Sequence, residues 1–204
     1  MSLAAVILAA GASRRMGSPK ALLRLPGAAG LAPETFADRL IAVFGARCAP
    51  VIVVLGHDAD RIAGSLVRRA EAALVVNHAH ELGQLSSLQC GLAAVPATSD
   101  GVMFTPVDHP GVAPSTVAAL ADAFEAARPP LAIPVHGGRR GHPVCCSREL
   151  IREILDLPPG ARASDVVHCH QAGAIYVTVE DLGVTVDIDD PAAYASFLEA
   201  VRQQ

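Results

Sequence analysis

The 204-residue sequence contains no tryptophan, and aromatic residues make up only 3% of it. Charged residues are also scarce, at 18%, whereas hydrophobic residues reach 51%. Disordered chains have the opposite balance, so the composition indicates a folded protein with a core of aliphatic side chains. At this length we expect a single domain over residues 1–204, without an interdomain linker.

Positive charge is in short supply for a protein that would bind nucleic acid. The chain has 16 Lys and Arg residues against 20 Asp and Glu, a formal net charge of −4. Binding to a phosphate backbone requires a broadly basic surface. We therefore expect no nucleic-acid partner, while a local basic pocket for a small anion remains compatible with this composition.

Long hydrophobic runs are missing too, and cysteines are few. No segment reaches the roughly 18 uninterrupted apolar residues of a membrane span, so no membrane partner is expected. The opening MSLAAVILAAGAS is apolar, but no basic residue precedes the run, which favours a buried strand over a signal peptide. Five scattered cysteines are unlike a secreted disulfide framework. These features predict a cytoplasmic protein with reduced cysteines.

Short runs rich in alanine and valine recur along the chain and have the length of strands buried on both faces. They cover residues 3–9, 50–56, 73–77, 101–107 and 131–135. Helical stretches between them are predicted to begin at Pro33, at Asp58, and at Ser115 or Thr116. This alternation predicts an α/β fold with a mostly parallel sheet between two layers of helices.

The last third of the chain departs from this rhythm. It is predicted to form a hairpin, a helix capped by Ser147, a second short helix, two β-rich runs and a final helix. The segments cover residues 136–146, 147–157, 160–170, 174–179, 183–188 and 189–202. We interpret this region as a small C-terminal insertion that faces the substrate.

The loop after the first apolar run reads LAAGASRRMGSPKALL and combines glycines with positive charge. Gly11 and Gly17 allow sharp bends that expose backbone N–H groups, and Arg14, Arg15 and Lys20 add cations. The glycine spacing matches neither a Walker loop nor a Rossmann fingerprint. In an open α/β sheet this loop lies beyond the carboxyl end of a strand, where ligands bind. The pattern predicts a polyphosphate site.

The same loop resembles the N-terminal signature of the MobA-like nucleotidyltransferases, and the resemblance extends over most of the chain. Further segments match the family in order: the Asn…Gly…Ser-Ser-Leu segment, the Asp-x-Pro strand end, the Arg-Gly-His-Pro turn and the Asp-Ile-Asp-x-Pro close. They lie at residues 77–92, 102–112, 138–144 and 186–194. Residues 24–35 replace a shorter turn of the family. The resemblance implies a three-layer, Rossmann-like nucleotidyltransferase fold.

The Ala-Ala-Gly start of the loop is most similar to the molybdenum cofactor cytidylyltransferase branch, since the guanylyltransferase branch has Ala-Gly-Gly. The resemblance implies transfer of CMP from CTP to a phosphorylated acceptor, molybdopterin, with release of pyrophosphate. It also implies a transient contact with a molybdoenzyme or its chaperone. Two alternatives stay open: a related NTP transferase acting on a sugar phosphate or another small phosphate, and a non-catalytic protein that binds and delivers a pterin cofactor.

Such a reaction brings two polyanions together, which favours Mg2+ held by carboxylates. Asp108 follows the strand at residues 101–107 and so lies on the same edge of the sheet as the opening loop. Asp187 and Asp189 alternate with Ile188, so an extended segment would place both on one face. The metal ligands are therefore expected to be Asp108, Asp187 and Asp189; between the last two the resemblance favours Asp187, with Asp189 close behind.

The resemblance also assigns roles to individual residues. Arg15, Lys20 and Asp108 would be catalytic, with the two cations on the β- and γ-phosphates. Nucleotide contacts fall on Leu8, Ala9, Ala10, Gly11, Lys20, Asn77, Gly83 and Ser87. The Ala10 methyl group would take the room that a purine needs. Ser87 has a second interpretation as a helix cap, and His142 would face the acceptor or be a buried, hydrogen-bonded histidine.

Overall fold

The computed structural model of the chain describes residues 2–26 and 33–202, and its centre is one sheet. The strands follow the order β10-β7-β9-β6-β1-β4-β5, and β8 pairs with β7 as a hairpin. Their bounds are β1 Leu3–Ala9, β4 Val51–Leu55, β5 Ala73–Val76, β6 Gly101–Pro106, β7 Leu131–His136, β8 Arg139–Arg140, β9 Val144–Ser147 and β10 Ile175–Thr178. β9 is antiparallel to both neighbours, whereas β1, β4, β5 and β6 pair in parallel. The predicted mostly parallel sheet is confirmed.

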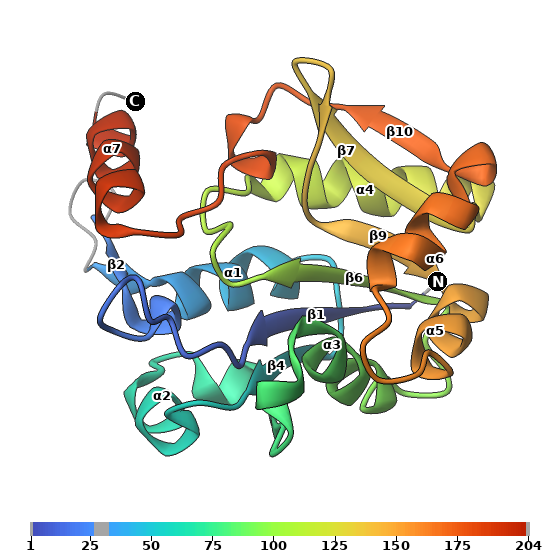
Figure 1. Cartoon of the computed structure of the whole chain (residues 1–204). Coiled ribbons are helices and arrows are strands. Elements are labelled where there is room, and N and C mark those ends of the chain that lie inside the picture. Colours follow the sequence, from blue (N-terminus) through green and yellow to red (C-terminus); the bar gives the residue numbers. More distant parts are fainter. Residues whose placement is uncertain (1, 27–32, 203–204) are drawn as a thin grey trace.

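β1 lies in the middle of the sheet because every one of its residues is apolar and buried. It pairs with β6 on one side and β4 on the other, with Leu8 opposite Pro106 and Ala9 opposite Leu55. This register brings the carboxyl ends of the three strands to one edge. The loops that follow these strands therefore meet there (Figure 1).

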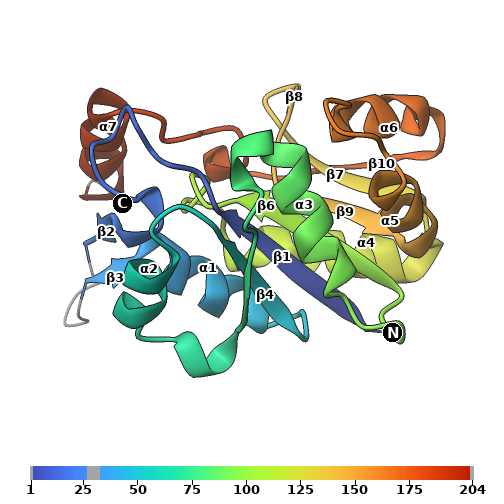
Figure 2. The ribbon, with the colours of Figure 1, turned by 60° about the horizontal axis from the view of Figure 1, so that its bottom comes forward.

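Helices cover both faces of the sheet, as Figures 1 and 2 show. Helices α1 (Phe36–Gly45) and α4 (Pro114–Ala127) pack on one face, where the core includes Ala5 and Ile7 of β1. On the other face, α3 (Gln84–Ala93), α5 (Arg148–Leu155) and α6 (Ala163–Cys169) cover Ala4 and Val6. Alternating β1 side chains thus supply two separate apolar cores.

α3 approaches the sheet closely because it carries a glycine where it crosses β1 and β4. A Cβ on Gly91 would lie 2.5 Å from Val6 Cγ1 and 2.7 Å from Val54 Cγ2. Such distances are too short for any side chain, so only glycine fits. This packing fixes the N-terminal end of α3 next to the loop after β1.

Several helix starts differ from the predictions. α1 begins at Phe36 with Thr35 as its N-cap, because residues 34–35 form strand β3 (Glu34–Thr35), paired with β2 (Arg24–Leu25). α4 begins at Pro114, and Thr116 uses its hydroxyl to donate to Asp181. Asp58 and Ser147 do lie at the N-caps of α2 (Ala59–Ser65) and α5, without a side-chain capping bond.

The structure of the C-terminal third confirms the predicted hairpin and both helices. The prediction of a strand at residues 183–188 is wrong. Residues 182–184 form a 3-10 turn, because Asp181 accepts a hydrogen bond from the Gly183 N–H, and residues 185–190 are not a strand. The other 3-10 turns are Lys20–Leu22, Arg69–Glu71, His80–Leu82 and Gln171–Gly173. Residues 27–32 of the stretch that departs from the family lie outside the described residues.

The last helix, α7 (Pro191–Arg202), packs at one edge of the molecule, above β2 in the view of Figure 1. Tyr194 contacts Phe36 of α1 edge to face, with ring centroids 5.8 Å apart. Within the described ranges, no helix has the length and hydrophobicity required to span a membrane. The five cysteines are free thiols.

Candidate active site

The loop after β1 turns back on itself through two residues in the left-handed region. Gly17 has φ +69°, as its predicted bend requires, whereas the second such residue is Ser13 (φ +49°) and not Gly11. Ser13 Oγ accepts a hydrogen bond from the Lys20 backbone N–H at 3.0 Å, and its carbonyl accepts one from Met16 at 2.9 Å. These bonds place Lys20 at the beginning of a 3-10 turn, with its side chain directed back toward the sheet edge.

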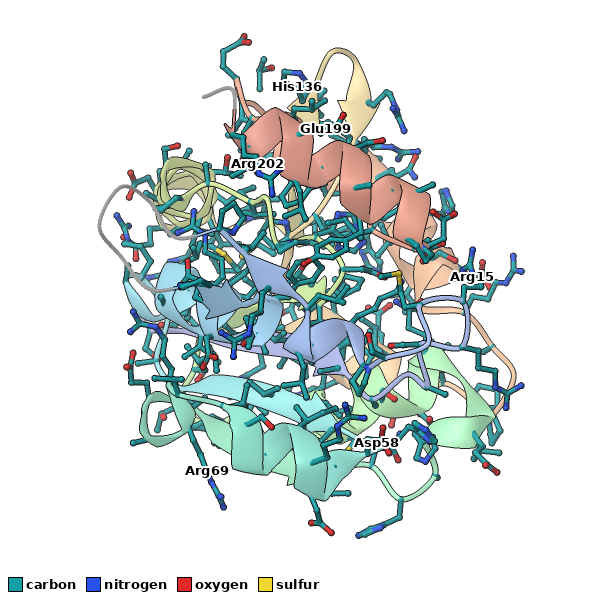
Figure 3. All side chains as sticks on the ribbon, turned by 90° about the vertical axis from the view of Figure 1, so that its left-hand side faces the viewer. Arg15, Asp58, Arg69, His136, Glu199 and Arg202 are labelled. Atoms are coloured by element: carbon teal, nitrogen blue, oxygen red, sulfur yellow. The ribbon has the colours of Figure 1, made fainter. Side chains whose placement is uncertain are left out.

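Four of the predicted catalytic and metal-binding residues meet in a charged cluster at this edge. Lys20 Nζ donates to Asp108 Oδ2 at 2.9 Å and to Asp189 Oδ1 at 2.6 Å. Arg15 Nη2 donates to Asp189 Oδ2 at 2.8 Å. Figure 3 shows Arg15 projecting outward from the loop near the beginning of α7. The sequence separations are large, so only the fold brings these groups together.

Protonation in this cluster follows from its hydrogen bonds. Burial acts to lower the pKa of Lys20, but the hydrogen bonds to Asp189 and Asp108 outweigh burial and raise the pKa overall. The hydrogen bond from Lys20 is the largest cause that lowers the pKa of Asp189. Lys20 and Asp189 therefore both remain charged at neutral pH.

A cavity of about 360 Å³ adjoins this cluster. Ten of the predicted site residues line it: Leu8, Ala9, Ala10, Gly11, Arg15, Lys20, Gly83, Ser87, Asp108 and Asp189. The sequence alone does not decide which of Arg14 and Arg15 contacts phosphate. Arg14 lines the cavity too. Ala10 is only 3% exposed, and its Cβ lies close to Gly56, so its methyl group offers little surface to a base.

Asn77 lies behind the wall of this cavity and is not among its lining residues. Its Nδ2 donates to Ser86 Oγ at 3.0 Å and to Ser87 Oγ at 3.1 Å, and its Oδ1 accepts from the Ala79 N–H. Asn77 thus holds the two serines at the start of α3, and its predicted direct contact with a nucleotide stays a prediction. Gly83 is the N-cap of α3, so Ser87 faces the cavity from inside the first turn and is not the cap.

The predicted cluster of three carboxylates does not form. Asp187 is exposed and does not line the cavity, and residues 185–190 form no strand, so the structure does not support the alternation argument. Across residues 2–26 and 33–202, no three His, Cys, Asp or Glu side chains gather closely enough to hold a metal. The two carboxylates that do converge, Asp108 and Asp189, are hard oxygen donors, and this set fits Mg2+, which keeps waters and binds substrate phosphates.

A second cavity of about 520 Å³ adjoins the first. It is lined largely by apolar side chains, with His142 and Arg162 among the polar ones. The apolar lining includes Leu82, Leu85, Leu88, Phe104, Val144 and Val167, and the residues that line both cavities are Leu8, Gln84 and Pro106. The prediction that His142 faces a second ligand is consistent with this placement.

His142 packs against a second histidine, His109, with ring centroids 4.8 Å apart. Burial lowers the pKa of His142 to about 4, and burial also lowers the pKa of His109. In both rings Nδ1 is buried and has no hydrogen-bond partner among the described residues. His142 is therefore a neutral imidazole at physiological pH.

Sequence reasoning missed three residues of this region: His109, Gln84 and Arg162. Gln84 follows Gly83 within a motif of the resemblance, and the structure makes it the first residue of α3, where a helix N-terminus favours anions. His109 and Arg162 carry no local signal, since the contact with His142 and the position beside the second cavity arise from packing between distant segments.

The profile of the MobA-like NTP transferase domain matches residues 5–175. The chain belongs to this family. A curated relative, the probable molybdenum cofactor guanylyltransferase of Mycobacterium ulcerans, is 34% identical over 113 residues, which are 55% of this chain and 51% of the relative. The chain thus matches about half the length of that relative.

Solved structures of this fold cover nearly the whole chain. A mycobacterial homologue of Rv0371c from Mycobacterium tuberculosis superposes with a TM-score of 0.82 at 26% identity, covering 99% of this chain and 98% of its own. Rv0371c itself, in complex with manganese, gives a TM-score of 0.78 at 25% identity, covering 98% and 100%. The predicted three-layer nucleotidyltransferase fold is confirmed.

Proposed function

We propose that this MobA-like protein transfers a nucleoside monophosphate from a nucleoside triphosphate to a phosphorylated pterin of the molybdopterin type and releases pyrophosphate. The observation that carries the proposal is the cluster of Lys20, Arg15, Asp108 and Asp189 on the wall of one cavity, with a second cavity directly adjoining it. Two adjoining sites are what a reaction between two bound phosphates requires.

The charged side chains have distinct tasks in this reaction. Arg15 and Lys20 would bind the phosphates of the leaving pyrophosphate and stabilise the charge that develops on it, Arg15 as a fork of donors and Lys20 as a point charge. Asp108 and Asp189 would hold Mg2+ or Mn2+, which neutralises charge on the triphosphate when bound. The manganese complex of the related Rv0371c supports a divalent cation.

For the nucleotide, we propose CTP, with GTP as the second candidate. The Ala-Ala-Gly sequence at residues 9–11 supports CTP through its similarity to the cytidylyltransferase branch. The guanylyltransferase name of the curated relative supports GTP. Because the Ala10 methyl group is buried, the choice between the bases depends on the neighbouring backbone of Leu8 to Gly11 more than on that methyl group.

For the acceptor, the second cavity favours a flat heteroaromatic ring over a sugar phosphate. Its wall carries leucine, valine and phenylalanine side chains, which suit an aromatic ring better than a ring of hydroxyl groups. Arg162 supplies a cation for the acceptor phosphate, and the neutral His142 supplies a hydrogen-bonding group. A transient contact with a molybdoenzyme, to which such a product would be passed, is part of this proposal.

The test is a transfer assay with CTP, GTP, ATP and UTP, each with Mg2+ or Mn2+ and with molybdenum-loaded molybdopterin, a sugar phosphate or no acceptor, together with a titration of pterin binding. Pyrophosphate release and the mass of the product are measured. We expect release with CTP only when the pterin is present. Release with GTP would change the nucleotide, release with a sugar phosphate would change the acceptor, and binding of pterin without turnover would indicate a delivery protein.

A further inference from the structure

Lys20 is the only lysine among the 16 Lys and Arg residues of the chain. Its ammonium group lies between two carboxylates, 2.9 Å from Asp108 Oδ2 and 2.6 Å from Asp189 Oδ1, and its side chain is 13% exposed. An ammonium is a compact charge on a flexible stem, whereas a guanidinium binds as a rigid planar fork. The chain therefore carries its one small, mobile cation at the point where two carboxylates converge.

These carboxylates come from segments that are distant in the sequence and that a backbone hydrogen bond holds together. Asp108 follows β6, and its carbonyl accepts a hydrogen bond from the Ile188 N–H at 2.9 Å, directly before Asp189. Two carboxylates held this close repel each other unless a cation lies between them. In the free protein Lys20 supplies this cation, with Arg15 on the outer side of Asp189.

The same two carboxylates are the ones that the proposed function assigns to the divalent cation, and the same lysine is assigned to the triphosphate. We propose that Lys20 takes the place of the divalent cation in the free protein and moves from the carboxylates to the phosphates when metal and nucleotide bind together. This inference rests on the proposed function and adds an exchange of cations within that site.

The exchange makes metal and nucleotide binding depend on each other. A divalent cation that arrives alone must displace the Lys20 ammonium while no anion is present to receive it, so it binds weakly. A nucleotide supplies the phosphates that Lys20 can contact, so the metal–nucleotide complex binds well. By linkage, the nucleotide must strengthen metal binding by the same factor that the metal strengthens nucleotide binding.

Removing the lysine should therefore change the two affinities in opposite directions. In Lys20→Met, the affinity for Mn2+ alone, measured from free Mn2+ by electron paramagnetic resonance, should rise about tenfold because no ammonium competes. The affinity for the manganese–nucleotide complex, measured by calorimetry, should fall. An unchanged or weaker affinity for Mn2+ alone would overturn the proposal.

Arg15→Met is the matched control, because it removes a cation that contacts only Asp189 and whose side chain is 69% exposed. Its affinity for Mn2+ alone should change much less than that of Lys20→Met. An equal gain in both variants would mean that general positive charge, and not the place of Lys20, opposes the metal, and would also overturn the proposal.

The unmodified protein offers a second measurement that needs no variant. Because the chain has one lysine, protein labelled with [15N]lysine gives a single Nζ signal in NMR spectra. Mg2+ alone should leave this signal in place, while Mg2+ with a non-hydrolysable α,β-methylene triphosphate should shift it. A signal that stays in place while calorimetry shows nucleotide binding would overturn the exchange. A shifted signal in a protein that releases no pyrophosphate would support the exchange and overturn the proposed function.

Discussion

The polar side chains of the two adjoining cavities differ in whether they have partners within the protein. In the first cavity, which we assign to the nucleotide and call the nucleotide cavity, Lys20, Asp108 and Asp189 are joined by short ion pairs. At the second cavity, which we assign to the acceptor and call the acceptor cavity, His142 packs against His109, and both rings have buried Nδ1 atoms without a partner among the described residues. The first site is held in place by its own charges, and a ligand must exchange with them. At the second site, the two histidine rings are held by packing against each other.

The largest effect is expected from neutralising a charge in the nucleotide cavity. Asp108→Asn removes one of the two carboxylates that contact Lys20, so kcat for transfer should fall by about a hundredfold or more. Pyrophosphate release at saturating substrates measures it. Asp122→Asn, in a surface ion pair with Arg47, is the control and should retain activity. A folded Asp108→Asn protein with nearly full turnover would remove the charged cluster from the chemistry.

On the acceptor side, the buried imidazole makes stability depend on pH. The pKa of His142 is about 4 in the folded protein, against about 6.5 in an unfolded chain. Below about pH 6.5 the unfolded chain takes up a proton that the folded protein does not, so the free energy of unfolding falls as pH decreases toward 4. At pH 5 the loss is about 2 kcal/mol.

His142→Asn should lack this loss. Urea unfolding of both proteins at pH 7 and pH 5 measures it, and the stability of the variant should decrease less between the two pH values. Because His142 packs against His109, the difference reports the contribution of His142 together with its effect on His109. Equal decreases would show that the ring is protonated in the folded state.

A third change separates the two cavities kinetically. Arg162→Ala should raise KM for the pterin acceptor about tenfold, through loss of one charge-assisted contact, and leave the Kd of the nucleotide unchanged. Initial rates and nucleotide titrations measure the two quantities. Arg69→Ala, on a 3-10 turn that borders neither cavity, is the control. A matching loss of nucleotide affinity would mean that the cavities act as one site.

The smallest effect concerns the contact that joins α3 to the acceptor side. Gln89 Nε2 donates to the carbonyls of Ile154 at 3.0 Å, Leu155 at 3.2 Å and Leu157 at 3.0 Å, at the end of α5. Gln89→Leu should lower the free energy of unfolding by about 1 kcal/mol. The acceptor KM should rise slightly, while nucleotide affinity stays constant. Thermal unfolding measures the stability, and initial rates measure the acceptor KM. An effect on nucleotide binding alone would contradict the assignment of Gln89 to the acceptor side.

The nucleotide cavity could be predicted in large part from the sequence, because its signals are local. Gly17, Arg15 and Lys20 lie in one short loop after an apolar strand, and Asp108 follows another strand that ends at the same edge. The acceptor side was predicted less completely. His142 is part of a recognisable turn, but Arg162 reaches the second cavity only through the packing of α6 on the sheet.

The errors have the same physical origin. The grouping of Asp187 with Asp189 depends on a strand at residues 183–188, but Asp181 and the close approach of Gly183 to Gly111 form a turn at residues 182–184, and no strand follows it. The motif predicts Asn77 on the nucleotide, whereas the packing of α3 brings Ser86 and Ser87 to its amide. Neither outcome is visible in local propensity.

The sequence by itself determined the class of fold and the presence of a bent, cationic loop after the first strand, because buried strands, glycine bends and clustered cations follow from residue type and spacing along the chain. Only the tertiary structure decided which charges meet. The partners of Lys20 lie 88 and 169 residues away, and contacts over such separations depend on how strands pair and helices pack. The position of one ammonium group between two carboxylates is a property of the folded chain.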